Sequence, residues 1–167
     1  MDEVQEQHER VTGDVFISEL NQKQGKRYKF YKRGSQAPDL IYRDGSSEIS
    51  LEIVTCYYDS NDAKFKWQNA RDLPSAPRGC SGINLDESLV MNINTVLENK
   101  CAKDYGQNCL LVVYILPPIT TFEEIKDLLP SIKVPSKHQF AGIYLMGDFG
   151  RTANSLIDHA IWELTSD

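Results

Sequence analysis

Residue types that mark zinc and redox sites are scarce in this chain. Its cysteines form no Cys-x-x-Cys pair, and none of its three histidines has a partner at ligand spacing. Zinc sites and redox motifs depend on such spacing. The chain also has no glycine-rich motif that would identify its substrate. Buried free thiols are therefore the favoured interpretation of the four cysteines, which are Cys56, Cys80, Cys101 and Cys109.

Long apolar runs are missing as well. No stretch approaches the roughly 20 apolar residues that cross a bilayer, so we expect no membrane association. The first ten residues, MDEVQEQHER, are polar and lack the apolar segment of a secretory signal. We therefore expect a cytoplasmic protein. With 167 residues, of which 41% are hydrophobic, the chain fits one globular domain over residues 1–167.

Positive charge is in deficit, with a net charge of −6. This argues against a protein whose whole surface binds nucleic acid. The deficit does not extend to residues 23–33, KQGKRYKFYKR, where cations alternate with aromatic rings. Such a segment is able to contact phosphates and stack on bases, with Lys29 and Arg33 as candidates. The alternative is a solvated edge strand whose lysines prevent unwanted pairing.

The first half of the chain predicts a helix followed by a three-stranded meander. Phe16 and Leu20 recur at helical spacing within residues 2 to about 21, and Gly25 ends that segment. Alternating strand patterns follow, with turns at Gly34 and at Asp44-Gly45. The predicted strands are RYKFYK, DLIYRD and EISLEIVT.

The second half predicts alternating helices and strands. A helix is expected over residues 86 to about 103, and the apolar run LLVVYIL reads as a buried central strand. Thr121 can cap the short helix FEEIKDLL, FAGIYLM indicates another buried strand, and SLIDHAIWEL predicts a closing helix. The whole order predicts an α/β fold: an αβββαβ core with a mixed central sheet flanked by helices, plus C-terminal αβα elements.

Two carboxylates in PDLIYRDGSSEISLEIVT point to a metal site. In a strand over residues 48–55, Glu52 and Val54 share one side while Leu51 and Ile53 take the other, so Glu52 is expected on the more exposed side. Asp39 begins the preceding strand, and a hairpin at Asp44-Gly45 would bring the two carboxylates to one end. Magnesium prefers a site with a few carboxylates and several retained waters.

These features resemble the PD-(D/E)XK nuclease superfamily, whose core is a restriction endonuclease-like αβββαβ arrangement. Pro38-Asp39 and Glu52 match the signature, and the element order agrees over about residues 2–116. Val54 departs from it, because the signature has a lysine there. The resemblance implies that Asp39 and Glu52 hold Mg²⁺ or Mn²⁺ and that the protein hydrolyses phosphodiester bonds in nucleic acid, with DNA favoured.

A nuclease of this kind needs a lysine from elsewhere. Lys100 follows Ile93 by seven residues and Leu97 by three, which places its ammonium on the mainly apolar face of the predicted helix. Lys103 is the second candidate. In related lineages a lysine from this helix is thought to reach the site, so the resemblance supports the same pair. The alternative is that both simply snorkel at a helix C-terminus.

The first helix offers a third carboxylate. Glu9 precedes Phe16 by seven residues and Leu20 by eleven, so it falls on the inward side, where a carboxylate needs a partner or a metal. The family's helix glutamate would lie about here, with Glu6 and Glu19 as alternatives. A solvated acidic first turn is the simpler interpretation.

Residues 56–84 form a long segment without a clean period, and such loops are often functional. Lys64, Lys66 and Trp67 would face the substrate if this loop were a flap. The alternative is a surface excursion with Trp67 packed on the core.

Two hypotheses follow. The first is a metal-dependent nuclease, favoured by the retained carboxylates. The second is a catalytically inactive nuclease-like domain that binds nucleic acid or a protein partner, favoured by Val54 and the net charge. The sequence leaves a homodimer open.

Overall fold

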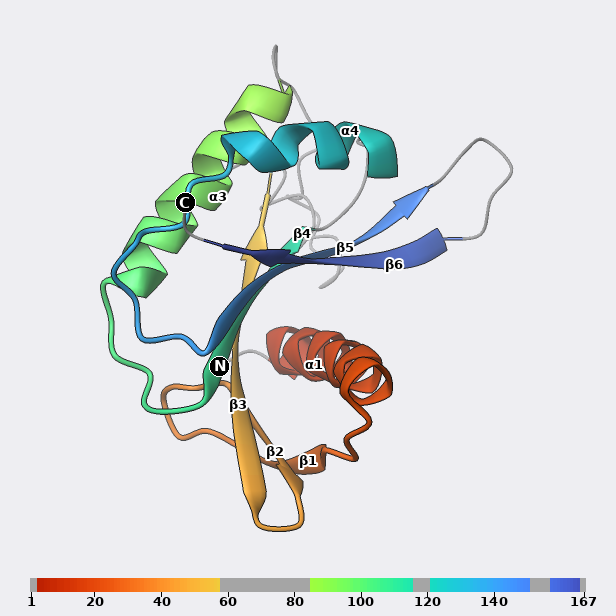
Figure 1. The fold of residues 1–167 in the computed structure, drawn as a ribbon, viewed down its shortest axis with the longest axis vertical. Helices are drawn as coiled ribbons and strands as arrows, with labels where there is room; N and C mark the ends of the chain where they lie inside the picture. Colours follow the sequence, from red (N-terminus) through yellow and green to blue (C-terminus); the bar gives the residue numbers. More distant parts are fainter. Residues whose placement is uncertain (1–2, 58–84, 116–120, 151–156, 166–167) are drawn as a thin grey trace.

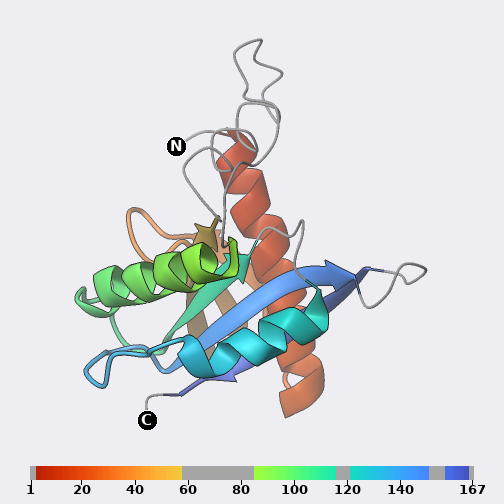
Figure 2. The ribbon, with the colours of Figure 1, turned by 90° about the horizontal axis from the view of Figure 1, so that it is seen from above.

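The computed structural model describes residues 3–57, 85–115, 121–150 and 157–165. Its centre is a six-stranded mixed sheet in which the strands follow chain order from β1 to β6. Helix α1 covers one face, and α3 and α4 cover the other, as Figures 1 and 2 show. The mixed sheet between helices agrees with the predicted α/β class. The elements are α1 Glu3–Gln24, β1 Lys29–Arg33, β2 Leu40–Asp44, β3 Ser47–Cys56, α3 Leu85–Cys101, β4 Cys109–Ile115, α4 Phe122–Leu128, a 3-10 turn Leu129–Ser131, β5 Gly142–Gly150 and β6 Ile157–Leu164.

Helix α1 packs its apolar side against the first strands. Phe16, Ile17 and Leu20 are buried with Leu40, Tyr42 and other apolar side chains of the sheet. Gly25 has φ of 65°, a left-handed conformation that suits a residue just past a helix end. The predicted helix is therefore confirmed, and it extends to Gln24.

Strands β1, β2 and β3 form the predicted antiparallel meander. The β2–β3 hairpin pairs Leu40 with Leu51 and closes at the Asp44–Ser47 pair, around the predicted Asp44-Gly45 turn. Gly45 has φ of 60°, which the tight turn requires.

Strands β3, β4 and β5 are parallel and form the buried centre. Every residue of β4 is buried, as expected of a strand covered on both faces. Helix α3 lies between β3 and β4 in sequence, and α4 between β4 and β5. Thr121 caps α4 as predicted, in a capping box with Glu124. These crossovers bring α3 and α4 to the same face of the sheet.

The predicted closing helix is wrong. Residues Ile157–Leu164 form β6, which pairs antiparallel with β5. In this strand Ala160, Trp162 and Leu164 face the α3–α4 side, whereas Ile161 faces α1. Apolar side chains on both faces of the strand give a spacing that also fits a helix, and pairing with β5 decides between them.

Within the described residues, no helix combines the length and the apolar character that a membrane span requires.

Candidate active site

Asp39 and Glu52 lie at the same end of the β2–β3 pair. The register pairs Leu40 with Leu51, so Asp39 comes directly before one member of this pair and Glu52 directly after the other. The Oδ2 atom of Asp39 accepts a hydrogen bond of 2.8 Å from the backbone N–H of Ile53. The structure thus brings together the two carboxylates that the sequence analysis selected.

Glu52 is not on an exposed face, contrary to the sequence prediction. Its residue exposure is 5%, because its side of β3 lies beneath α3 and not against solvent. Val54 and Cys56, on the same side, belong to the core under α3, while Leu51 and Ile53 pack toward α1. The alternation of faces was predicted correctly, but both faces of β3 are covered.

Lys100 reaches Glu52. Its Nζ atom donates a hydrogen bond of 2.5 Å to Oε1 of Glu52, from the last turn of α3. The side chains are 23% and 7% exposed, so the ion pair is largely shielded from water. Burial alone would lower the pKa of Lys100, but the bond to Glu52 outweighs it and the pKa is raised. Lys103, the second candidate, lies past the end of α3 with an exposed side chain.

Glu9 is buried, as its spacing predicted, and is paired with Arg33. The Nη2 atom of Arg33 donates to Oε2 of Glu9, and Nη1 donates to the backbone carbonyl of Glu6 at 3.1 Å. Glu9 is 5% exposed, whereas the alternative Glu6 is half-buried and Glu19 is exposed. Arg33, proposed from sequence as a substrate contact, therefore ties β1 to α1.

A β-bulge turns Arg33 toward Glu9. Phe30 pairs with Tyr42, but Lys32 pairs with Ile41, so the strand holds one extra residue at Tyr31. Without it, Arg33 would lie on the opposite face from Phe30, because faces alternate along a strand. The bulge reverses this, as bulges do near functional positions.

The cluster is electrostatically strained at Asp39. Burial, helped by the charges of Glu52 and Glu9, raises the pKa of Asp39 to about 6, although the hydrogen bond from Ile53 and the charge of Lys100 act to lower it. Ionising Asp39 therefore adds negative charge to a partly desolvated site that already holds carboxylates. A bound cation would remove this cost.

Asp39 and Glu52 offer oxygen donors of the kind that magnesium prefers. Within the described residues, no group of three or more His, Cys, Asp or Glu side chains is close enough to hold a metal. Magnesium nevertheless needs only one or two carboxylates, with waters and substrate phosphates completing the shell. Oε2 of Glu52 is buried and has no hydrogen-bond partner among the described residues. A cation shared with Asp39 would satisfy it.

Comparisons with known proteins do not assign this chain to a family. No protein-family model, curated protein or solved structure matches this chain. The likeness to the PD-(D/E)XK nucleases therefore stands on Pro38, Asp39 and Glu52 and on the order of the elements.

Cys109 is a buried thiol close to the carboxylates. It pairs with Ser50 in the β3–β4 register and is fully buried. Burial raises its pKa to about 11, and the charges of Glu52 and Asp39 act in the same direction. The thiol stays protonated at neutral pH, in agreement with the expected buried free cysteine.

Sequence reasoning missed Tyr105. Its ring lies near Lys100, with the Nζ atom 5.7 Å from the ring centroid. Tyr105 follows the helix in a turn and belongs to no periodic segment, so no sequence signal marked it. The predicted loop candidates Lys64, Lys66 and Trp67 lie outside the described residues. Lys29 is exposed on β1.

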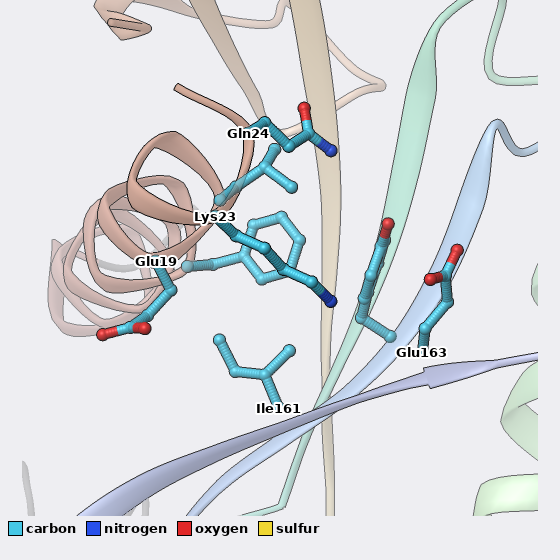
Figure 3. A pocket seen from close by; sticks show the side chains of 8 residues that line it. Glu19, Lys23, Gln24, Ile161 and Glu163 are labelled. Atoms are coloured by element: carbon cyan, nitrogen blue, oxygen red, sulfur yellow. The ribbon is translucent and has the colours of Figure 1, made fainter. Parts of the chain in front are cut away.

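A separate pocket lies away from the carboxylates. It is a hollow of about 330 Å³ between α1 and the β5–β6 strands. Figure 3 shows Lys23 reaching from α1 across it toward the side where Glu163 lies, while Glu19 points away. None of the predicted site residues lines it, apart from the weak alternative Glu19, so it has no part in the site described above.

The turn before Asp39 depends on Gly34. Its N–H donates to the carbonyl of Asp39 at 3.0 Å, and a Cβ at this position would lie 1.7 Å from the carbonyl oxygen of Pro38. We expect Gly34→Ala to lower the free energy of unfolding by about 3 kcal/mol, because backbone must move to admit the methyl group. Urea denaturation measures this. The exposed neighbour Ser35→Ala should change it by less than about 0.5 kcal/mol, and equal midpoints for the two variants would contradict this account of the turn.

Proposed function

We propose that the protein is a metal-dependent nuclease that hydrolyses phosphodiester bonds, with DNA as the favoured substrate. The observation that supports this most is the contact between Lys100 and Glu52. In this proposal Lys100, from α3, would take the part of the lysine that the nuclease signature has at position 54. A carboxylate pair with a lysine beside it is the set that such a hydrolysis needs.

Each residue has a task in this proposal. Asp39 and Glu52 would hold Mg²⁺, which when bound polarises the scissile phosphate and lowers the pKa of a bound water. Lys100 would place its positive charge next to the phosphate, where negative charge develops in the transition state. Glu9, fixed by Arg33, would lie outside the metal shell and orient water.

An exposed aromatic surface supports nucleic acid as the substrate. Tyr31 is 48% exposed on β1, and the guanidinium of Arg43 stacks 3.5 Å from its ring centroid. Lys32 lies near the same ring, at 5.5 Å. Rings with adjacent cations bind single-stranded bases through stacking and charge. Arg43 lies near the turn end of β2, whereas Asp39 precedes the other end of that strand.

One observation favours the inactive alternative. Glu52 and Glu9 are each paired with a cation of the chain, Lys100 and Arg33. These two ion pairs balance two of the three carboxylate charges without any metal. A nuclease-like domain that binds nucleic acid without cutting it would keep the same pairs.

Cleavage distinguishes the two proposals. Purified protein should cut single- or double-stranded DNA with Mg²⁺ or Mn²⁺ and should stop in EDTA. Glu52→Ala should abolish cutting, because the buried oxygens of Glu52 are proposed metal ligands. Glu98→Ala is the matched control, since Glu98 is an exposed carboxylate on α3, the helix that carries Lys100, and it should keep near wild-type activity.

The outcomes separate as follows. Cutting that survives Glu52→Ala would remove the metal-site assignment. A wild-type protein that binds DNA in a gel-shift assay but never cuts it would establish the inactive alternative. Circular dichroism of each variant confirms that it remains folded.

A further inference from the structure

The ring of Tyr105 is fixed next to Lys100. It stacks on Phe140 with centroids 5.0 Å apart and an angle of 26° between the rings. Phe140 is 7% exposed and belongs to the core beneath α3 and α4. The Nζ atom of Lys100 lies 5.7 Å from the Tyr105 centroid, inside the range of about 6 Å for a cation–π interaction.

Backbone contacts hold both rings in place. The N–H of Gly106 donates to Oδ1 of Asp104 at 2.8 Å, which closes the turn around Tyr105. Gly106 has φ of 81°, a conformation that a glycine adopts freely. The N–H of Ala141 donates to the carbonyl of Cys109 at 2.8 Å, which fixes the segment carrying Phe140 beside the start of β4.

Lys100 needs this second contact if Glu52 binds a metal. Its Nζ atom donates to Oε1 of Glu52 at 2.5 Å, and the hydroxyl of Tyr105 is its second described hydrogen-bond partner. A cation on Glu52 would compete for the same carboxylate and would repel the ammonium. A long lysine side chain without its partner gains rotamer freedom and turns to water.

We propose that Tyr105 is a positioning residue: its ring, held by Phe140, keeps the Lys100 ammonium beside Asp39 and Glu52 when the carboxylates bind a metal. The metal-bound part of this inference rests on the proposed nuclease function, whereas the anchoring of Lys100 does not. Tyr105 acts through Lys100 and is not itself proposed to touch the substrate.

The charges around Tyr105 agree with this placement. Burial raises the pKa of Tyr105, and the ammonium of Lys100 opposes this while the carboxylates of Glu52 and Asp39 add to it. The phenol therefore stays neutral at pH 7 and keeps its ring available to the cation.

Competitive amine labelling tests the anchor without any need for catalysis. In EDTA, Tyr105→Leu should raise the labelling rate of Lys100 about three- to tenfold, the range expected for losing one partly shielded cation–π contact. Tyr105→Phe keeps the ring and loses only the hydroxyl contact, so its Lys100 labelling rate should stay closer to wild type than to Tyr105→Leu. Lys103 serves as an internal reference in the same digest, and Tyr31→Leu is the control for removing a tyrosine elsewhere.

Labelling in the presence of Mg²⁺ should show a second effect on Lys100, which general loosening of the segment around Tyr105 would not produce. With saturating Mg²⁺, the excess labelling of Lys100 in Tyr105→Leu should exceed the excess in EDTA, because Glu52 no longer holds the ammonium. Under the proposed function the same variant should lower kcat for cleavage without changing the Mg²⁺ concentration that gives half-maximal activity.

Failures of the two proposals are distinguishable. Equal Lys100 labelling in wild type and Tyr105→Leu overturns the role of Tyr105, whether or not the protein cuts DNA. A parallel rise at Lys103 overturns it too, because it reveals general loosening. A labelling change in EDTA combined with no cleavage by wild type supports the anchor and overturns the nuclease.

Discussion

Lys100→Met will lower the free energy of unfolding at pH 7 by about 3–5 kcal/mol, the usual cost of removing one partner of a buried ion pair. Glu52 is 5% exposed and its Oε2 atom already lacks a partner among the described residues. Losing the ammonium would leave its charge in the core beneath α3 without compensation. Chemical denaturation at fixed ionic strength measures the change.

Two variants make this result specific. Lys103→Met removes an exposed lysine just past the same helix and should change stability by less than about 0.5 kcal/mol. The double variant Lys100→Met, Glu52→Gln replaces both charges and should recover most of the loss. If Lys100→Met costs no more than Lys103→Met, the ion pair does not hold α3 to β3.

The same substitution affects activity under the proposed function. Lys100→Met should remove cleavage, because no other lysine of the described residues contacts Glu52. The double variant should recover stability but not cleavage. This separation of folding from cutting is what a lysine with a chemical role predicts.

Much of the fold was predictable because its signals are local. The period of Phe16 and Leu20, the turn at Asp44-Gly45 and the cap at Thr121 each specify a local conformation, and each is confirmed. The exception is β6, where spacing fits a helix equally well. Its strand conformation depends on pairing with β5, a tertiary contact that forms only when the sheet is assembled.

The sequence predicted which residues belong to the candidate site better than it predicted which elements cover them. Helical spacing placed Lys100 and Glu9 on inward faces, and the structure agrees. The burial of Glu52 was missed, because alternation within one strand does not reveal that α3 covers its polar side. Helix α3 is distant from β3 in the sequence, so no pattern within β3 indicates that the helix covers it.

Two other features depend on contacts that no local pattern encodes. Arg33 turns to Glu9 through a bulge at Tyr31, and a single extra residue in a strand leaves no mark in the alternation of KFYKR. Tyr105 is placed by Phe140, which is distant in sequence. Both belong to the surroundings of the site, where tertiary contacts override local preference.

Asp39→Asn will abolish metal-dependent cleavage and yet stabilise the metal-free protein. Loss of a proposed ligand removes a metal that contributes several kcal/mol, so the cleavage rate should fall about 10³-fold. The amide oxygen of Asn can still accept the hydrogen bond from Ile53, so the turn should survive. Steady-state cleavage at saturating Mg²⁺ measures the loss.

The stability effect has the opposite sign because the pKa of Asp39 is raised from 3.8 to about 6. The folded state binds more protons than the unfolded state between these values, so the free energy of unfolding falls as pH rises through this window. Asp39→Asn removes that fall. At pH 7 in EDTA we expect the substitution to raise the free energy of unfolding by about 1–2 kcal/mol, since solvent screening of this half-buried carboxyl reduces the full linkage value.

Denaturation midpoints from pH 4 to pH 7 measure this pH dependence for the wild type and for Asp39→Asn. A wild-type profile parallel to that of Asp39→Asn would show that Asp39 carries no such strain. Stability gained where activity is lost would mark Asp39 as a residue kept for binding a cation and not for folding.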